Sequence, residues 1–150
     1  MRFWPLLADN AQAVGGKLYL LGGGWNVCGP GPLTAALAGI VELDWDEANQ
    51  PRRVRIVLLT EDGQPVRVPT ATGDREVVLE GNVEVGRPPG TRPGISFNVP
   101  IAINFGPLPI PPGGRFVWQF WVDGQTRDDW RLPFSTRPAP GAQAEQPPRQ

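Results

Sequence analysis

The chain has 150 residues, of which 40% are hydrophobic and 19% charged, and its formal net charge is −1. This length and composition fit one globular domain, and a chain without excess positive charge has no global field to attract nucleic acid or an anionic membrane. Histidine is absent, which removes the commonest general base and the commonest zinc ligand. We therefore expect a protein that is not an enzyme and that uses no cofactor and no metal.

The first predicted strand covers residues 2–8. The segment "MRFWPLLADNAQA" (residues 1–13) imitates a signal peptide, but Pro5 interrupts its apolar stretch and Asp9 ends it. A signal peptide needs a longer apolar core, and no run approaches the length of a transmembrane helix. Because Cys28 is the single cysteine, an intramolecular disulfide framework is excluded. These features predict a cytoplasmic protein.

The second predicted strand covers residues 17–25 and runs into three consecutive glycines, within "KLYLLGGGWNVCGPGP" (residues 17–32). A phosphate-binding loop needs spaced glycines that open a helix, and neither GxGxxG nor GxxxxGK[ST] occurs. Another strand-like run follows instead of a helix. We therefore interpret the glycines as a bulge or bend in a strand, with Trp25 packing nearby.

Residues 33–43 form the next predicted strand, which is small and apolar on both faces, as in a strand covered on two sides. A strand over 54–58 follows and ends at the turn 61–63. Between them, residues 44–50 have room for one helical turn. Period-2 alternation then recurs in three further runs, at 77–85, 97–105 and 116–122.

Two details refine these later strands. Pro100 cannot donate to a β-ladder, so it indicates an edge strand or a bulge. Asp123-Gly124 follows the aromatic run 116–122, and the alternation resumes at 130–134, which predicts a hairpin closed through that dipeptide.

The repeated short strands and turns predict an all-β fold, a single antiparallel β-sandwich of about eight strands over residues 1–136. The remaining segment, 137–150, is rich in proline and has no apolar periodicity. We expect it to be a disordered tail.

The densest basic spot of the sequence contains Arg52, Arg53 and Arg55. Such a group can meet an acidic partner, but Glu42 and Glu84 lie on polar strand faces and can neutralise it across a sheet. We favour this cross-strand charge ladder.

The six tryptophans are the most suggestive feature of the composition. We expect Trp118 and Trp130 to fill the core. Trp25, Trp45 and Trp121 are the candidate interaction residues, because exposed aromatic rings stack on sugars or anchor protein interfaces. For Trp45 and Trp121 the sequence does not decide between a place in the core and a place at an interface.

The segment "LLADNAQAVGGKLYLLGGGW" (residues 6–25) resembles the opening of an uncharacterised, largely actinobacterial family of bacterial domains. That opening has an Ala-Asp-x-Ala segment followed by Gly-Lys-Leu-x-x-x-Gly-Gly-Gly-Trp. Further similar segments extend the resemblance to nearly everything before the tail, at 61–66, 85–90, 108–124 and 128–134. The resemblance implies a compact β-rich fold and assigns no activity.

We therefore expect a non-enzymatic interaction or assembly module, acting through an aromatic-containing sheet face or a loop end. Its partner is another protein or a second copy of the chain, and one version is a subunit of a bacterial or phage-encoded assembly. The alternative is a β-sandwich that binds a carbohydrate or another small ligand through exposed tryptophan.

Overall fold

The computed structural model describes residues 1–141, and these residues are almost entirely β-structure. They form eleven strands and one 3₁₀ turn, η1 (Trp45–Glu47), with no α-helix among them. The prediction of an all-β fold is confirmed, but there are more strands than the eight or so expected. Three strands have only two to four residues, β3 (Val27–Cys28), β6 (Arg67–Thr70) and β7 (Gly73–Glu76), and such short segments show no clear alternation.

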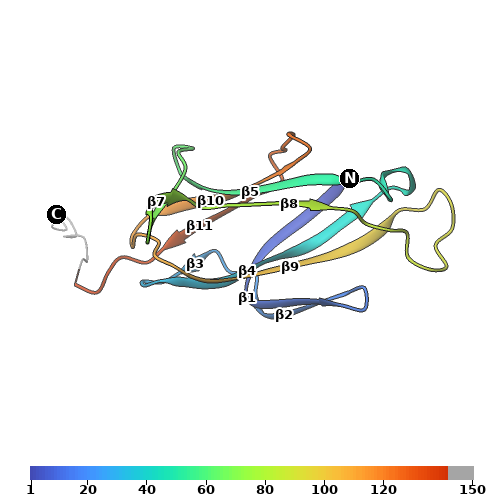
Figure 1. Ribbon diagram of the computed structural model, residues 1–150. Helices are drawn as coiled ribbons and strands as arrows, with labels where there is room; N and C mark the ends of the chain where they lie inside the picture. Colours follow the sequence, from blue (N-terminus) through green and yellow to red (C-terminus); the bar gives the residue numbers. More distant parts are fainter. Residues whose placement is uncertain (142–150) are drawn as a thin grey trace, which may run out of the picture.

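Two sheets stack face to face, as Figure 1 shows. One sheet has four strands in the order β2-β1-β4-β9, and the other has five in the order β3-β11-β10-β5-β8. Neighbouring strands are antiparallel except for the short pairing of β3 with β11. The longer strands are β1 (Arg2–Val14), β2 (Lys17–Gly23), β4 (Leu33–Leu43), β5 (Arg52–Thr60), β8 (Val78–Val83), β9 (Phe97–Leu108), β10 (Arg115–Val122) and β11 (Arg131–Thr136).

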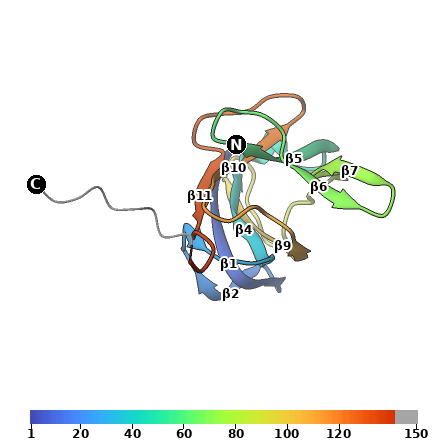
Figure 2. The ribbon, with the colours of Figure 1, turned by 90° about the vertical axis from the view of Figure 1, so that its left-hand side faces the viewer.

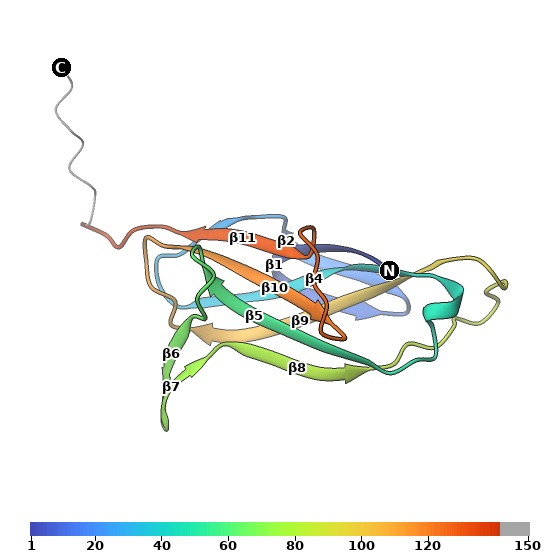
Figure 3. The same cartoon turned by 90° about the horizontal axis from the view of Figure 1, so that it is seen from above.

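The β6–β7 hairpin is separate from both sheets. It projects away from the body of the sandwich in the views of Figures 2 and 3. Its base is tied to β5, because Val66 donates a backbone hydrogen bond to Leu58 and Val77 accepts one from the same residue.

Aromatic side chains join the two sheets in the core. Trp118 and Phe120 on β10 meet residues of the other sheet: Phe120 contacts Phe3 edge-on at 4.9 Å between ring centroids, and Trp118 lies 5.5 Å from Phe105. Trp118 is 1% exposed and Trp130 is 3% exposed. The prediction that these two tryptophans belong to the core is confirmed.

Strand β1 changes partners along its length. Its first half, up to Ala8, pairs with β4, and its second half pairs with β2. The second half crosses the outer face of the β4–β9 pair, where the side chain of Asn104 bonds the backbone of Ala11 in both directions, at 3.1 and 2.7 Å. The β1–β2 hairpin is thus a third layer beneath β4 and β9 (Figure 1).

Small side chains make this third layer possible. Four alanines are almost completely buried between the hairpin and the sheet: Ala8, Ala11, Ala36 and Ala38. Since β4 contributes two of them, and its other face joins the main core, β4 is covered on both faces as its composition predicts.

The glycines at the end of β2 permit the bend. Gly22 has φ +60°, a conformation that favours glycine, and a Cβ there would collide with the carboxylate of Asp9. Gly24 donates its N–H to the carbonyl of Leu7 at 2.7 Å, which closes the hairpin against β1. No helix follows, so the interpretation of a bent strand is confirmed.

Two further local predictions are confirmed. Pro100 lies on β9, which is an edge strand of its sheet. The β10–β11 connection turns at Asp123 and Gly124, which have φ +50° and +76°, between two reciprocal backbone hydrogen bonds of Val122 and Gln125. Positive φ at both turn residues is the requirement of a type I′ turn.

The last described residues follow β11 without regular structure. Arg137 is held there, because its N–H donates to the carbonyl of Cys28 at 2.8 Å and its guanidinium to that of Gly29 at 2.9 Å. The expectation of a disordered tail over 137–150 falls largely on 142–150, which lie outside the described residues. In the described part of the chain, no helix has the length and apolar character needed to cross a membrane.

Candidate functional site

Trp25 follows the glycine bend at the end of β2. Its ring is half-buried and packs against the main core, and its Nε1 is buried with no acceptor among the described residues. This residue therefore acts in part as a core residue at the side of the sandwich where β3 joins the sheet.

Trp45 begins the 3₁₀ turn η1 and is half-buried. The guanidinium of Arg87 lies 3.7 Å from the centroid of the Trp45 ring and donates to its carbonyl at 2.9 Å. A cation–π contact of this kind stabilises the loop and covers one face of the ring.

Trp121 lies on the outer face of the five-stranded sheet, opposite Arg55 in the β5–β10 register. It lines a hollow of about 530 Å³ together with Arg53, Arg55, Asp123 and Gly124. Trp25, Trp45 and Trp121 make no aromatic ring contact with one another within residues 1–141. The structure therefore does not bring the three predicted interaction residues together.

The basic spot of the sequence is divided between the two faces of β5. Arg53 and Arg55 point outward, and Arg55 pairs at 3.1 Å with Glu80, its neighbour on β8. Cross-strand pairing is thus found, with Glu80 in place of the expected Glu42 and Glu84. Glu42 pairs instead with Arg2 across β1 and β4.

A group of exposed apolar side chains, which the sequence did not single out, lies on β1 and β2. Eight large apolar side chains are exposed in residues 1–141, and five are on these two strands: Trp4, Val14, Tyr19, Leu20 and Leu21. On the hairpin their exposed fractions run from 41% to 70%. Single exposed apolar residues are common on protein surfaces, but here Val14, Tyr19 and Leu21 share the outward face of one hairpin, with Leu20 on its other face.

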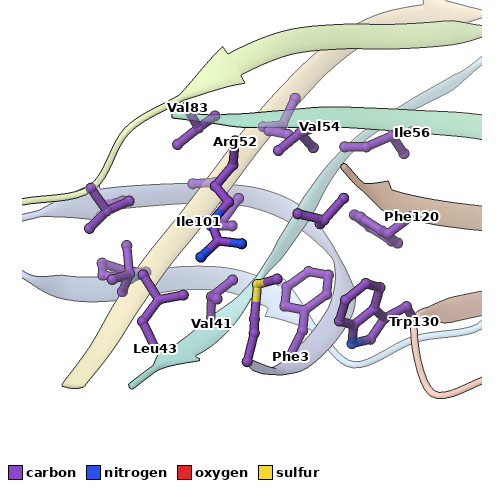
Figure 4. A pocket seen from close by; sticks show the side chains of 18 residues that line it. Phe3, Val41, Leu43, Arg52, Val54, Ile56, Val83, Ile101, Phe120 and Trp130 are labelled. Carbon is purple, nitrogen blue, oxygen red and sulfur yellow. The ribbon is translucent and has the colours of Figure 1, made fainter. Parts of the chain in front are cut away.

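A second feature is an apolar cavity of about 400 Å³ between the sheets. Figure 4 shows aliphatic and aromatic side chains from both sheets around it, among them Val41 and Ile101 on one side and Val54 and Phe120 on the other. The guanidinium of Arg52 lies among them, because Arg52 and Val54 are two residues apart on β5 and so point to the same, inward face of the sheet. The alternation along this strand can be predicted from the sequence, but the cavity cannot.

A polar cavity of about 350 Å³ adjoins the apolar one. The two share lining residues that include Arg52 and Trp130, and the polar cavity adds Glu47, Asp123 and Arg127. Arg52 donates to Asp123 Oδ2 and to the carbonyl of Glu47, both at 3.3 Å. Arg52 Nε and Trp130 Nε1 are buried with no acceptor within residues 1–141.

The carboxylate of Glu47 has its own partners. Although burial raises its pKa, hydrogen bonds from the N-terminal ammonium (2.8 Å) and from the backbone N–H of Asp44 (3.2 Å) bring the pKa of Glu47 below its ordinary value. Glu47 is therefore ionised at neutral pH, and the atom that Arg52 contacts is its carbonyl oxygen.

Within residues 1–141, no three His, Cys, Asp or Glu side chains gather in a way that could hold a metal ion. A model for a family of unknown function (DUF6941) matches residues 4–135, so it begins within β1 and ends within β11. The sequence-based resemblance to a family of unknown function is thereby confirmed. Comparison with curated proteins and with solved structures found no match.

Proposed function

The chain belongs to DUF6941, a family of unknown function, and we propose that it is a non-enzymatic module that associates with a second copy of itself through the β1–β2 hairpin. The observation that carries this proposal is the concentration of exposed apolar side chains on that hairpin.

The outward face of the hairpin is nearly uncharged. Tyr19 and Leu21 share it with Gln12 and Asn10, their register partners on β1. Within β2 the single charged residue is Lys17, at its first position. Natural edge strands are usually protected from pairing by charges, prolines or bulges along their length. In β2 the charge of Lys17 stands at the start and the Gly22 bend near the end, so residues 18–21 between them are free of such protection.

The free edge of β2 supports pairing with another strand. In the four-stranded sheet β2 pairs with β1 on one side and has no strand on the other, among the residues described. Two copies related by a two-fold axis can pair their β2 strands in antiparallel fashion, so that Leu21 and Tyr19 of each copy become cross-strand neighbours of the partner's side chains on one continuous sheet. Such an interface is self-complementary and closes as a dimer.

The alternative function, carbohydrate binding through exposed tryptophan, is less well supported. It needs rings arranged along one groove, whereas Trp45 is covered on one face by Arg87 and Trp121 lies on β10. We therefore retain self-association as the proposal.

The test is the solution mass of the full chain, measured by light scattering after size exclusion over a range of concentrations. We expect a dimer, and we expect Leu21→Glu to shift it to monomer, because a carboxylate at a 70% exposed position is harmless in the monomer and costly in the interface. Ile95→Glu is the matched control: Ile95 is 52% exposed but lies in the loop between β8 and β9.

A native chain that is monomeric at every concentration would refute self-association. Loss of the dimer with Trp121→Ala and not with Leu21→Glu would move the interface to the outer face of the five-stranded sheet.

A further inference from the structure

The apolar cavity between the sheets has the size and lining of a ligand site. Its volume of about 400 Å³ lies in the range of roughly 300–1,000 Å³ typical of small-molecule sites. Protein cores are normally filled to crystal-like density, and an unfilled apolar space loses dispersion contacts on all its walls. An apolar occupant restores those contacts.

The cavity has an entrance at the edges of the sandwich. Strand β8 is at one edge of its sheet and β9 at one edge of the other, and both contribute lining residues. Val83, on β8, is 44% exposed, so the apolar lining continues to the surface there. No hydrogen-bonded strand pair closes this side, since β8 and β9 belong to different sheets.

The part of the cavity that adjoins the polar one supplies hydrogen-bond donors. Arg52 and Trp130 line both the apolar cavity and its polar neighbour, and each has a buried N–H without an acceptor among the described residues. An unpaired buried donor destabilises the empty site, so an acceptor placed here gains more than it would at the surface.

We propose that this cavity binds an alkyl carboxylate, that is, a free fatty acid, with its chain between the sheets and its carboxylate beside Arg52 and Trp130. A carboxylate only accepts hydrogen bonds, which suits two donor groups. Asp123 already pairs with Nη1 of Arg52, but Nε is left free and can donate a charge-assisted hydrogen bond to a second carboxylate.

The probe is dodecanoate, titrated into the full chain and followed by calorimetry and by tryptophan fluorescence. We expect saturable binding that is much tighter than that of 1-dodecanol, which has the same chain without the charge, and no binding of acetate, which lacks the chain. A charge-assisted hydrogen bond contributes enough that Arg52→Gln should weaken dodecanoate binding about tenfold or more. Arg55→Gln, on the outward face of the same strand, is the matched control and should leave binding unchanged.

A second variant tests the proposal even if Arg52→Gln does not fold. Val54→Phe adds a ring inside the cavity and should abolish binding while the chain keeps its native circular dichroism and thermal transition. Failure of dodecanoate to bind the native chain would overturn the proposal, as would equal affinity for 1-dodecanol or unchanged binding in Val54→Phe.

A last arm separates a free fatty acid from the acyl chain of a membrane lipid. We expect no co-sedimentation of the chain with phosphatidylcholine–phosphatidylglycerol vesicles under the conditions in which dodecanoate binds. Co-sedimentation that is lost in Val54→Phe would overturn the assignment of a free acid.

Discussion

A single glycine decides how closely two neighbouring strands of the four-stranded sheet approach. Gly39 on β4 lies opposite Pro5 of β1, and a Cβ at this position would come within 2.9 Å of the Phe3 ring and 3.0 Å of the Pro5 Cα. The backbone conformation at Gly39 is an ordinary one, so it is the neighbouring atoms that require glycine here.

We expect Gly39→Ala to lower the free energy of unfolding by about 1–3 kcal/mol, because the added methyl group overpacks the contact between β1 and β4. Gly81 on β8 is the matched control, since a Cβ there meets nothing within 4 Å. Gly81→Ala should be neutral or gain about 0.5 kcal/mol from reduced chain entropy. Urea titration followed by fluorescence measures both, and equal effects would refute the steric explanation.

Among the elements, the β1–β2 hairpin depends on one side chain for its position. Asn104 of β9 donates to the carbonyl of Ala11 at 2.7 Å and accepts from its N–H at 3.1 Å, and Ala11 is 1% exposed. These two bonds replace the strand pairing that the second half of β1 lacks on that side.

We expect Asn104→Ala to destabilise the chain by about 1–3 kcal/mol, because it leaves two buried backbone groups of Ala11 without partners. Amide hydrogen exchange should accelerate most in β2 and in the second half of β1. Asn98→Ala, on the same outward face of β9 but exposed, is the control. Uniform acceleration throughout both sheets would show that Asn104 supports the whole fold and not the hairpin.

The molecule as a whole is packed unevenly between its two sheets. Around Phe116, Trp118 and Phe134 the space is filled by large aromatic side chains, whereas around Val54, Ile101 and Phe120 it opens into the apolar cavity. Strand β5 runs through both regions: Leu58 is completely buried, and Val54 lines the cavity.

This unevenness predicts opposite results for the same kind of substitution on one strand. Leu58→Phe should lower the free energy of unfolding by about 1–3 kcal/mol, because it adds atoms where there is no space. Val54→Phe should be neutral or stabilising, because it fills empty volume. Thermal unfolding of both variants measures the difference, and a similar loss in both would mean that the cavity is not available to a side chain.

The sequence by itself determined the strands of the sandwich and much of its core. Alternation is a local property, so a run such as 116–122 reveals its buried face without knowledge of what lies opposite. The same is true of the Asp123-Gly124 turn, since positive φ at two successive residues is a local requirement. The short strands β3, β6 and β7 were not predicted, because they are shorter than the alternating pattern that identifies a strand.

The tertiary structure alone decided where the candidate sites are. The exposed hairpin exists because β1 leaves β4 and crosses its own sheet, and that path depends on a contact between residues 93 positions apart, Ala11 and Asn104. The cavity depends on the distance between two sheets, and on the meeting of Arg52, from β5, with Trp130, from the loop before β11. Both features depend on contacts between residues that are far apart in the chain, so no local sequence pattern predicts them.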